Sequence, residues 1–284
     1  HGEYRRQRQM CIRDRHMSIS KNFEDAIKVT ETSSGNFTAN ISDNWSIGQT
    51  ANGGYSMSLL AKACSEYLDH KDPLVLSANY IDRVEFGPAD IEVSKIASTK
   101  STSTAYVSLK QKGNLKIFTT VTFTDFSKMK GLKENLRSEP NFEDYETCTQ
   151  VPYKEGFSPK LDKNLEKKYC SDSIWWENPK EENQATLKLY MGWKDGGPVN
   201  LFGLILFLDA TTPPIYNKLG TVGWVPTLTL TSHIRNIPEP GPLKVIAKTE
   251  FITNNYIEED REIWDSKGNL VGQSKQLAKL RIKK

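Results

Sequence analysis

The chain contains an internal repeat, and this repeat restricts the folds open to it more than any other feature. The turn sequence EFGP at 85–88 recurs as EPGP at 239–242, 154 positions later. The triplet GNL at 113–115 recurs at 268–270, 155 positions later. Two turn signals at nearly the same spacing, in matching contexts, predict a duplicated unit of roughly 100 residues.

The two copies have the same predicted order of elements. An apolar helix is expected at about 52–68 in the first copy and at about 199–210 in the second. Alternating segments rich in β-branched residues follow each helix, for example TAYVSLKQKG and KIFTTVTFTDF. Because Gly-Asn pairs sit where hairpins should turn, the strands are expected to form an antiparallel sheet with the helix covering one face. The predicted fold class is α+β.

The repeat divides the chain into two units joined by a connector. The N-terminal unit is expected at 17–126 and the C-terminal unit at 191–284, with a charged, irregular connector at 127–190. The Arg-rich segment 1–16 is interpreted as a tag-like leader outside the fold, because it has no apolar core and Met17 looks like a natural start.

The formal net charge of +3 comes from this leader, whose five Arg outnumber Glu3 and Asp14. The rest of the chain is therefore neutral, and no nucleic-acid partner is expected. No apolar run approaches the roughly 20 residues that a membrane span requires, and LFGLILFLDA at 201–210 is too short. A cytoplasmic location is the default expectation, since the C-terminal RIKK is not a peroxisomal tripeptide.

The cysteines predict neither a disulfide framework nor a metal site. Cys64, Cys148 and Cys170 are widely spaced and form no CxxC pair. Cys64 falls at helical spacing with Met57 and Leu60, which favours a place in the core. No metal and no cofactor is expected.

Two polar residues in apolar surroundings are candidates for chemistry. Asp209 follows the uncharged run LFGLILFL, so it is either buried with partners or exposed at a helix end, where the negative end of the dipole disfavours it. Gln276 shares a predicted strand face with Gly272, Ser274 and Ala278. Small residues suit a face on which a helix packs, so an inward Gln276 needs a partner: a reacting group or a backbone group at the seam.

Four motifs carry a family resemblance. They are W-x-x-G-x-x-x-N-G-G-Y at 45–55, LDATTPP at 208–214, VPTLTL at 225–230 and EIWDSKGNLVGQSKQLAKLR at 262–281. On these motifs the chain resembles the acyl-CoA thioesterase II-like (TesB-like) double hotdog proteins. The resemblance implies two tandem hotdog units, each a central helix wrapped by a long antiparallel sheet, and hydrolysis of acyl-CoA to free acid and CoA.

The resemblance also assigns roles to residues. Carried over by motif, Asp209, Thr227 and Gln276 together hold and activate a water. Asp209 would be the general base, and Thr227 and Gln276 would orient the water. Thr229 is a supporting residue. The chain departs from the family at Thr229-Leu230, where relatives often have Asp-His, and at 105–106, where Ala-Tyr replaces an Arg-containing segment.

The stretch ANGGYSMSLLAKA at 51–63 places two glycines at a helix start. Glycines there allow close packing, and the backbone N–H groups at the start can bind a polarised oxygen. The N–H groups of Gly54 and Tyr55 are therefore expected to meet the thioester oxygen, with Gly53 in support. At an offset of 154, Tyr55 corresponds to Asp209. A nucleotide loop is excluded, since G-x-G-x-x-G is absent.

Other functions stay open. The main alternative is a non-catalytic acyl or acyl-CoA binding protein of the same fold. A hotdog enoyl-CoA hydratase would need an Asp/His pair that the sequence does not show, and a Ser or Cys hydrolase is disfavoured because no G-x-S-x-G elbow or Cys–His arrangement occurs. His233 is expected to be an exposed or hydrogen-bonded strand residue. A monomer would already contain the usual hotdog pair, and a homo-oligomer is the other expectation.

Overall fold

The computed structural model describes residues 18–282 except 178, 180, 181 and 183, so the proposed leader at 1–16 lies outside the described residues. The helices are α2 (Ile19–Ala26), α3 (Gly53–Tyr67), α4 (Leu201–Phe207) and α5 (Tyr216–Leu219), with short 3-10 helices η1 (Asp43–Trp45), η2 (Phe126–Lys128), η3 (Tyr145–Thr147), η4 (Lys160–Lys163) and η5 (Ser171–Ser173).

The strands contain many more residues than the helices do. They are β1 (Val29–Ser33), β2 (Asn36–Ile41), β3 (Ser46–Ile47), β4 (Thr50–Ala51), β5 (Asp72–Tyr80), β6 (Gly87–Ser98), β7 (Ser103–Gln111), β8 (Asn114–Thr124), β9 (Thr149–Gln150), β10 (Leu165–Tyr169), β11 (Thr186–Trp193), β12 (Thr227–Ile234), β13 (Leu243–Lys248), β14 (Ile252–Thr253), β15 (Tyr256–Trp264) and β16 (Leu270–Lys279).

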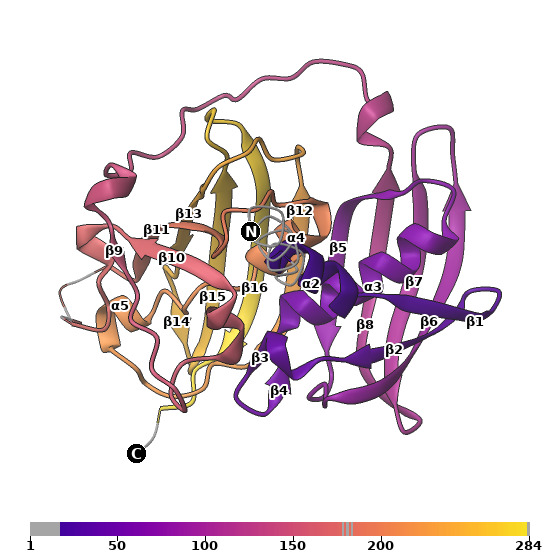
Figure 1. The fold of residues 1–284 in the computed structure, drawn as a ribbon, viewed down its shortest axis with the longest axis horizontal. Helices are drawn as coiled ribbons and strands as arrows, with labels where there is room; N and C mark the ends of the chain where they lie inside the picture. The colour runs from indigo at the N-terminus through magenta and orange to yellow at the C-terminus, as the bar shows by residue number, and fades with distance from the viewer. Residues whose placement is uncertain (1–17, 178, 180–181, 183, 283–284) are drawn as a thin grey trace, which may run out of the picture.

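One long antiparallel sheet runs through both copies (Figure 1). Its order is β1-β2-β6-β7-β8-β5-β12-β16-β15-β13-β11-β10-β9, with β14 paired to β15. Outward from the central pair β5–β12, the strands of the two copies appear in matching chain order. The predicted α+β fold with two tandem helix-and-sheet units is confirmed.

The turn signals act as expected. In the first copy, the β7–β8 hairpin turns at Lys112 and Gly113, which have φ values of 52° and 80°. Left-handed conformations at both central residues are typical of the tight turns that match strand twist. The second GNL lies at the start of β16, which pairs with β15 in the equivalent hairpin.

The predicted connector is less irregular than expected. Residues of β10 and β11 fall largely within 127–190, yet these strands pair in the main sheet. The sequence LEKKY of β10 hides its alternation, because the inward Lys167 is buried and its Nζ is paired with Asp162 Oδ1 at 2.6 Å. The stretch after β8 arches over one end of the molecule before reaching η3 (Figure 1).

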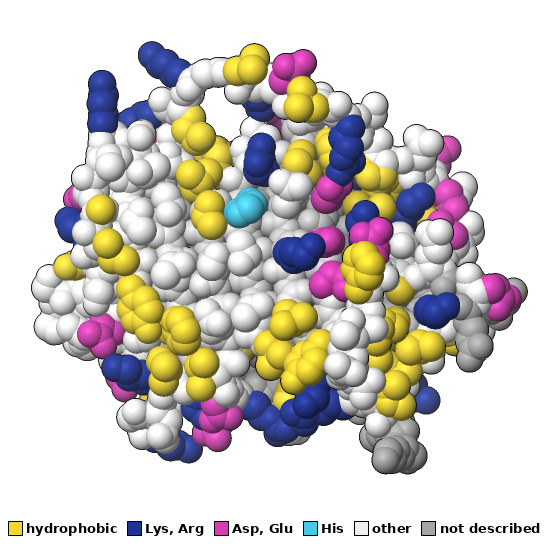
Figure 2. All heavy atoms as spheres, turned by 180° about the vertical axis from the view of Figure 1, so that it is seen from behind, with side chains coloured by type: hydrophobic (Ala, Val, Ile, Leu, Met, Phe, Trp, Pro, Cys, Tyr) yellow, Lys and Arg dark blue, Asp and Glu magenta, His cyan; other side chains and the backbone are white. Residues whose placement is uncertain are grey.

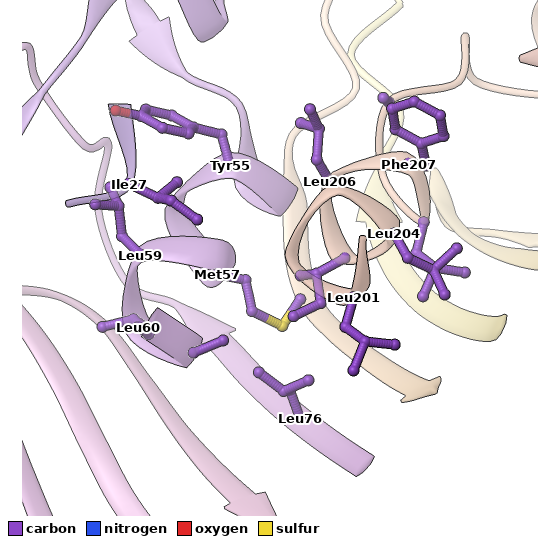
Figure 3. Close-up of a cluster of buried hydrophobic side chains, with 14 of the residues drawn as sticks. Ile27, Tyr55, Met57, Leu59, Leu60, Leu76, Leu201, Leu204, Leu206 and Phe207 are labelled. Atoms are coloured by element: carbon purple, nitrogen blue, oxygen red, sulfur yellow. The ribbon is translucent and has the colours of Figure 1, made fainter. Parts of the chain in front are cut away.

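The two central helices pack against each other inside the curve of the sheet (Figure 3). Ten of the fifteen residues of α3 are buried, so this helix is surrounded by protein rather than amphipathic. Met57 of α3 and Leu201 of α4 lie between the helices in Figure 3. Cys64 is fully buried, which confirms its predicted place in the core.

The glycine pair lets α3 approach the end of α4. A Cβ atom on Gly54 would lie 2.9 Å from both the Asp209 Cβ and the Leu206 carbonyl oxygen. A Cβ on Gly53 would lie 2.8 Å from Asp209 Oδ2. The predicted close packing is therefore the reason for these glycines, and the neighbour is the end of α4.

The repeat offset does not hold for the helices. Asn52 caps α3 and Asn200 caps α4 in the same way, and these residues are 148 positions apart. Tyr55 therefore corresponds to Gly203, and its predicted equivalence with Asp209 is wrong. The reason is the long segment between α4 and β12, which contains α5 and has no counterpart between α3 and β5.

Figure 2 shows the molecule from behind. Figure 2 shows mainly uncharged side chains over its centre, with Lys and Arg gathered at the lower edge. His233 is an exposed strand residue, as expected. Within the described part of the chain, no helix combines the length and apolar character needed to cross a membrane.

Candidate active site

A pocket of about 330 Å³ lies where the two copies meet. The first copy contributes the start of α3 and the end of β5, and the second contributes the segment after α4 and parts of β12, β15 and β16. Four of the predicted site residues line it: Gly53, Asp209, Thr227 and Gln276.

Asp209 is held by the start of the opposite copy's helix. Its side chain is 9% exposed, and its Oδ2 accepts hydrogen bonds from Gly54 N–H at 2.9 Å and Asn52 Nδ2 at 3.1 Å. The N-terminus of α3 carries a partial positive charge that favours a carboxylate. The poor electrostatic position of Asp209 after α4 is thus compensated by α3, and the exposed reading of this residue is wrong.

The pKa of Asp209 is raised above its ordinary value, mainly because burial disfavours the charged form. Arg261 and the hydrogen bonds from Gly54 and Asn52 act in the opposite direction, as does Lys167. A carboxylate whose pKa is moved toward neutrality is better suited to general-base catalysis than an ordinary aspartate.

Gln276 lies on the inward face predicted for it. Gly272, Ser274 and Ala278 on the same face of β16 are also buried, and Ser274 Oγ donates to the Leu208 carbonyl at 2.9 Å. Gln276 Oε1 accepts from Arg261 Nη1 at 3.1 Å. The partners of the Gln276 amide are the charged side chains of Arg261 and Glu259. The interpretation that Gln276 satisfies a backbone group between helix and sheet is therefore wrong.

Glu259 and Arg261 are residues that sequence reasoning missed. They are 1% and 2% exposed, on the inward face of β15 between the buried Ile257 and Ile263. Both line the pocket. The period-two alternation from Ile257 to Ile263 was the available signal, since it places these charges on the buried face.

The guanidinium of Arg261 connects three side chains. Nη2 donates to Glu259 Oε2, Nη1 to Gln276 Oε1, and Nε to Thr211 Oγ1 at 2.6 Å. Glu259 Oε2 also accepts from Gln276 Nε2 at 3.0 Å. Glu259 Oε1 is buried and has no partner among the described residues. Burial raises the pKa of Glu259 against the opposing effect of Arg261.

The two threonines of VPTLTL are separated by a bulge. The register shifts between Thr227, opposite Ala278, and Thr229, opposite Leu277, so Leu228 is the extra residue. Thr227 lines the pocket, whereas Thr229 is exposed and is not a pocket residue. Regular alternation along VPTLTL predicts that both threonines share one strand face, and the bulge makes this prediction wrong.

Two of the backbone N–H groups at the α3 start already have protein partners. Gly54 N–H donates to Asp209, and Tyr55 N–H donates to Asn52 Oδ1 at 3.0 Å. The Tyr55 side chain is fully buried and donates its hydroxyl to the Ala26 carbonyl. Within the described chain, Gly53 N–H makes no hydrogen bond, and Gly53 lines the pocket.

The lining of the pocket includes cations around an aromatic ring. The Arg83 guanidinium carbon lies 4.4 Å from the Trp224 ring centre, and that of Arg281 lies 5.7 Å from it. Lys279 also lines the pocket. Asp82, which directly precedes Arg83 in the sequence, also lines the pocket, and its carboxylate is paired with Lys116.

Two family descriptions match the chain. Residues 41–124 match the acyl-CoA thioesterase N-terminal domain, and residues 145–280 match the acyl-CoA thioesterase C-terminal domain. Together the matches span well over half of the chain. All the pocket residues named above fall within them, except Arg281.

Solved structures share the fold. A candidate thioesterase II from Thermobifida fusca is 25% identical with a TM-score of 0.82, over 91% of this chain and 97% of that one. A hot dog fold protein from Alicyclobacillus acidocaldarius is 16% identical with a TM-score of 0.82, over 93% and 99%. The acyl-CoA thioesterase II TesB2 of Mycobacterium marinum is 12% identical with a TM-score of 0.74, over 92% and 98%.

A shorter similarity is found to an uncharacterised protein of Mycobacterium tuberculosis. It is 32% identical over 81 residues, which make up 28% of this chain and 27% of that protein. The similarity thus spans about a quarter of that relative's length.

Proposed function

The chain belongs to the acyl-CoA thioesterase family, and on this premise we propose that it hydrolyses an acyl-CoA thioester to a free acid and CoA. Family membership supports thioesterase activity in general. The observation that most supports the specific proposal is Asp209, a buried carboxylate with a raised pKa in a pocket that also contains Thr227 and Gln276.

In the proposed mechanism, Asp209 accepts a proton from a water as the water oxygen bonds to the thioester carbonyl carbon. The carbon–sulfur bond of the tetrahedral intermediate then breaks, and CoA leaves as a thiolate that takes up the proton. Thr227 and Gln276 orient the water, and this alignment supplies part of the rate. Asn52 and Gly54 hold the Asp209 carboxylate in place through their hydrogen bonds.

The α3 start would stabilise the negative oxygen of the intermediate. Gly54 and Tyr55 can serve only if the substrate replaces the Asp209 and Asn52 oxygens that they now contact. Gly53 N–H needs no such exchange, which makes it the more direct donor of the three.

The cations of the pocket lining fit the substrate class. CoA carries phosphate groups, and Arg guanidinium groups bind phosphate through paired hydrogen bonds. Arg83, Lys279 and Arg281 line the pocket and would meet such anions. An acyl thioester of CoA therefore fits the pocket better than an uncharged ester.

A panel of acyl-CoAs of graded chain length, with thiol release as the readout, tests the proposal. Wild-type protein is expected to release CoA, and Asp209→Asn is expected to lower kcat about 10²- to 10⁴-fold, the range for loss of a general base. Asp82→Asn is a matched control, since it removes a carboxylate from the same pocket lining. It should retain kcat within a few-fold.

Two results would contradict the proposal. Absence of turnover over the whole panel, with saturable binding by calorimetry, would support the non-catalytic acyl-CoA binding alternative. Full activity of folded Asp209→Asn would exclude the mechanism. Hydration of crotonyl-CoA is measured separately, and absence of this activity would exclude an enoyl-CoA hydratase.

A further inference from the structure

The buried pair Glu259–Arg261 is unusual for the interior of a sheet. Both side chains are almost fully buried and both line the pocket. A buried ion pair rarely stabilises a protein more than apolar residues of the same size would. Its place here therefore calls for a reason other than stability.

One reason is the orientation of the Gln276 side chain. Arg261 Nη1 donates to the amide oxygen, and the amide nitrogen donates to Glu259 Oε2. A donor on one side and an acceptor on the other allow only one orientation of the amide. The planar guanidinium is itself held at its Nε by Thr211, so the amide is set by a rigid group.

The second reason is the charge that faces Asp209. Arg261 and Glu259 face it from β15, and Lys167 faces it from β10. Lys167 is already paired with Asp162. From β5, the neutral Tyr80 hydroxyl faces Asp209 and donates to the Gly53 carbonyl at 2.9 Å.

Among the described residues, the hydrogen-bond partners of Asp209 are uncharged. The α3 start presents only Asn52 and the Gly54 N–H. The other charged residues of the pocket lining are Asp82, Arg83, Lys279 and Arg281.

We propose that Arg261 and Glu259 are positioning residues of this site: Arg261 orients the Gln276 amide and offsets the negative charge of Asp209, and Glu259 limits that offset. Glu259 Oε1 is a buried acceptor with no hydrogen-bond partner among the described residues. This inference rests on the proposed function, because it assigns the pair to the same reaction.

The test is the pH profile of kcat/KM for three variants. Arg261→Gln removes the cation, so the acid limb, where the base becomes protonated, is expected to move to higher pH by about one unit or more. Glu259→Gln removes the opposing anion, so the limb should move to lower pH. Arg261→Lys keeps the positive charge but loses the planar set of guanidinium donors that orients the Gln276 amide. We therefore expect kcat to fall about tenfold or more, while the acid limb of the pH profile stays near its wild-type position.

A matched control lies on the same strand. Asp260→Asn removes a carboxylate from the opposite face of β15, where it pairs with Lys275 at the surface. It should leave both kcat and the profile unchanged. Circular dichroism and melting curves report whether each variant folds, and Glu259→Gln and Arg261→Lys keep the test informative if Arg261→Gln does not fold.

Opposite shifts for the two charge-removing variants would support the proposal, since a folding defect lowers activity without such shifts. Falls in kcat with unchanged profiles would overturn it. A second readout is independent of turnover: the ¹³C chemical shift of the Asp209 carboxyl, followed across pH. Its titration midpoint should move to higher pH in Arg261→Gln and to lower pH in Glu259→Gln. If wild-type protein hydrolyses no acyl-CoA, the proposed function fails while this titration still decides the role of the pair.

Discussion

The equivalent strands β7 and β15 carry different inward residues. Ala105 and Val107 of β7 lie 154 positions before Glu259 and Arg261, and all four are buried. Ala105 is opposite Val121 on β8, just as Glu259 is opposite Gln276 on β16. The first copy therefore has an apolar core where the second has a polar network.

The two copies contribute different parts of the candidate site. The first copy supplies the glycine-rich start of α3, which holds the Asp209 carboxylate. The second copy supplies Asp209 and the charged inward face of β15. Because each half lacks what the other provides, the pocket requires both copies.

The largest effect is expected from introducing a buried charge into the first copy, which lacks the partners that the second copy provides. Ala105→Glu places a carboxylate on a fully buried position. It is expected to lower the free energy of unfolding by about 3–5 kcal/mol, as for an uncompensated buried charge. Urea denaturation measures this. Tyr106→Glu, on the exposed side of the same strand, should change stability little, and equal effects would contradict the assignment.

The reverse change makes the second copy like the first. Glu259→Leu combined with Arg261→Met replaces the ion pair with apolar residues of similar size. Stability is expected to stay the same or rise by about 1–4 kcal/mol, because two charges no longer need burial. Thiol release should nevertheless fall at least tenfold. An active double variant would show that the network is not needed for function.

The close contact between α3 and α4 can be tested at Gly54. Gly54→Ala adds a Cβ that must displace Asp209 and the α4 backbone. A loss of about 1–3 kcal/mol in unfolding free energy is expected from this overpacking, together with lower activity. Gly192→Ala serves as the control, since its Cβ would meet nothing within 4 Å. Wild-type activity in Gly54→Ala would argue against a role for this contact.

The smallest expected effect is the pH dependence of stability. The pKa of Asp209 is raised in the folded protein from an ordinary 3.8, so the folded state binds the proton more tightly than the unfolded state. This residue therefore costs stability as pH rises above about 4 and through its folded pKa. Asp209→Asn should be as stable as wild type or more stable at pH 7, with the difference vanishing near pH 4. Melting curves across this range would show a contradiction if the variant is less stable only at neutral pH.

Much of the fold follows from local patterns in the sequence. The repeated turns and the alternation of segments such as KIFTTVTFTDF predict the antiparallel sheet, because a strand exposes alternate residues to opposite faces. The inward face of Gln276 follows for the same reason. The β10 strand was missed because Lys167 is buried with a partner, which inverts the usual relation between charge and exposure.

The arrangement of the site depended on tertiary structure. Asp209 and Gly54 are 155 positions apart, and only the packing of α4 against α3 brings them together. The bulge at Leu228, which turns Thr227 into the pocket and Thr229 away from it, arises from pairing with β16. The two units and the buried faces of most strands follow from the sequence alone. The contacts between the units, and therefore the partners of each buried charge, depended on the tertiary structure, because residues distant in the chain make them.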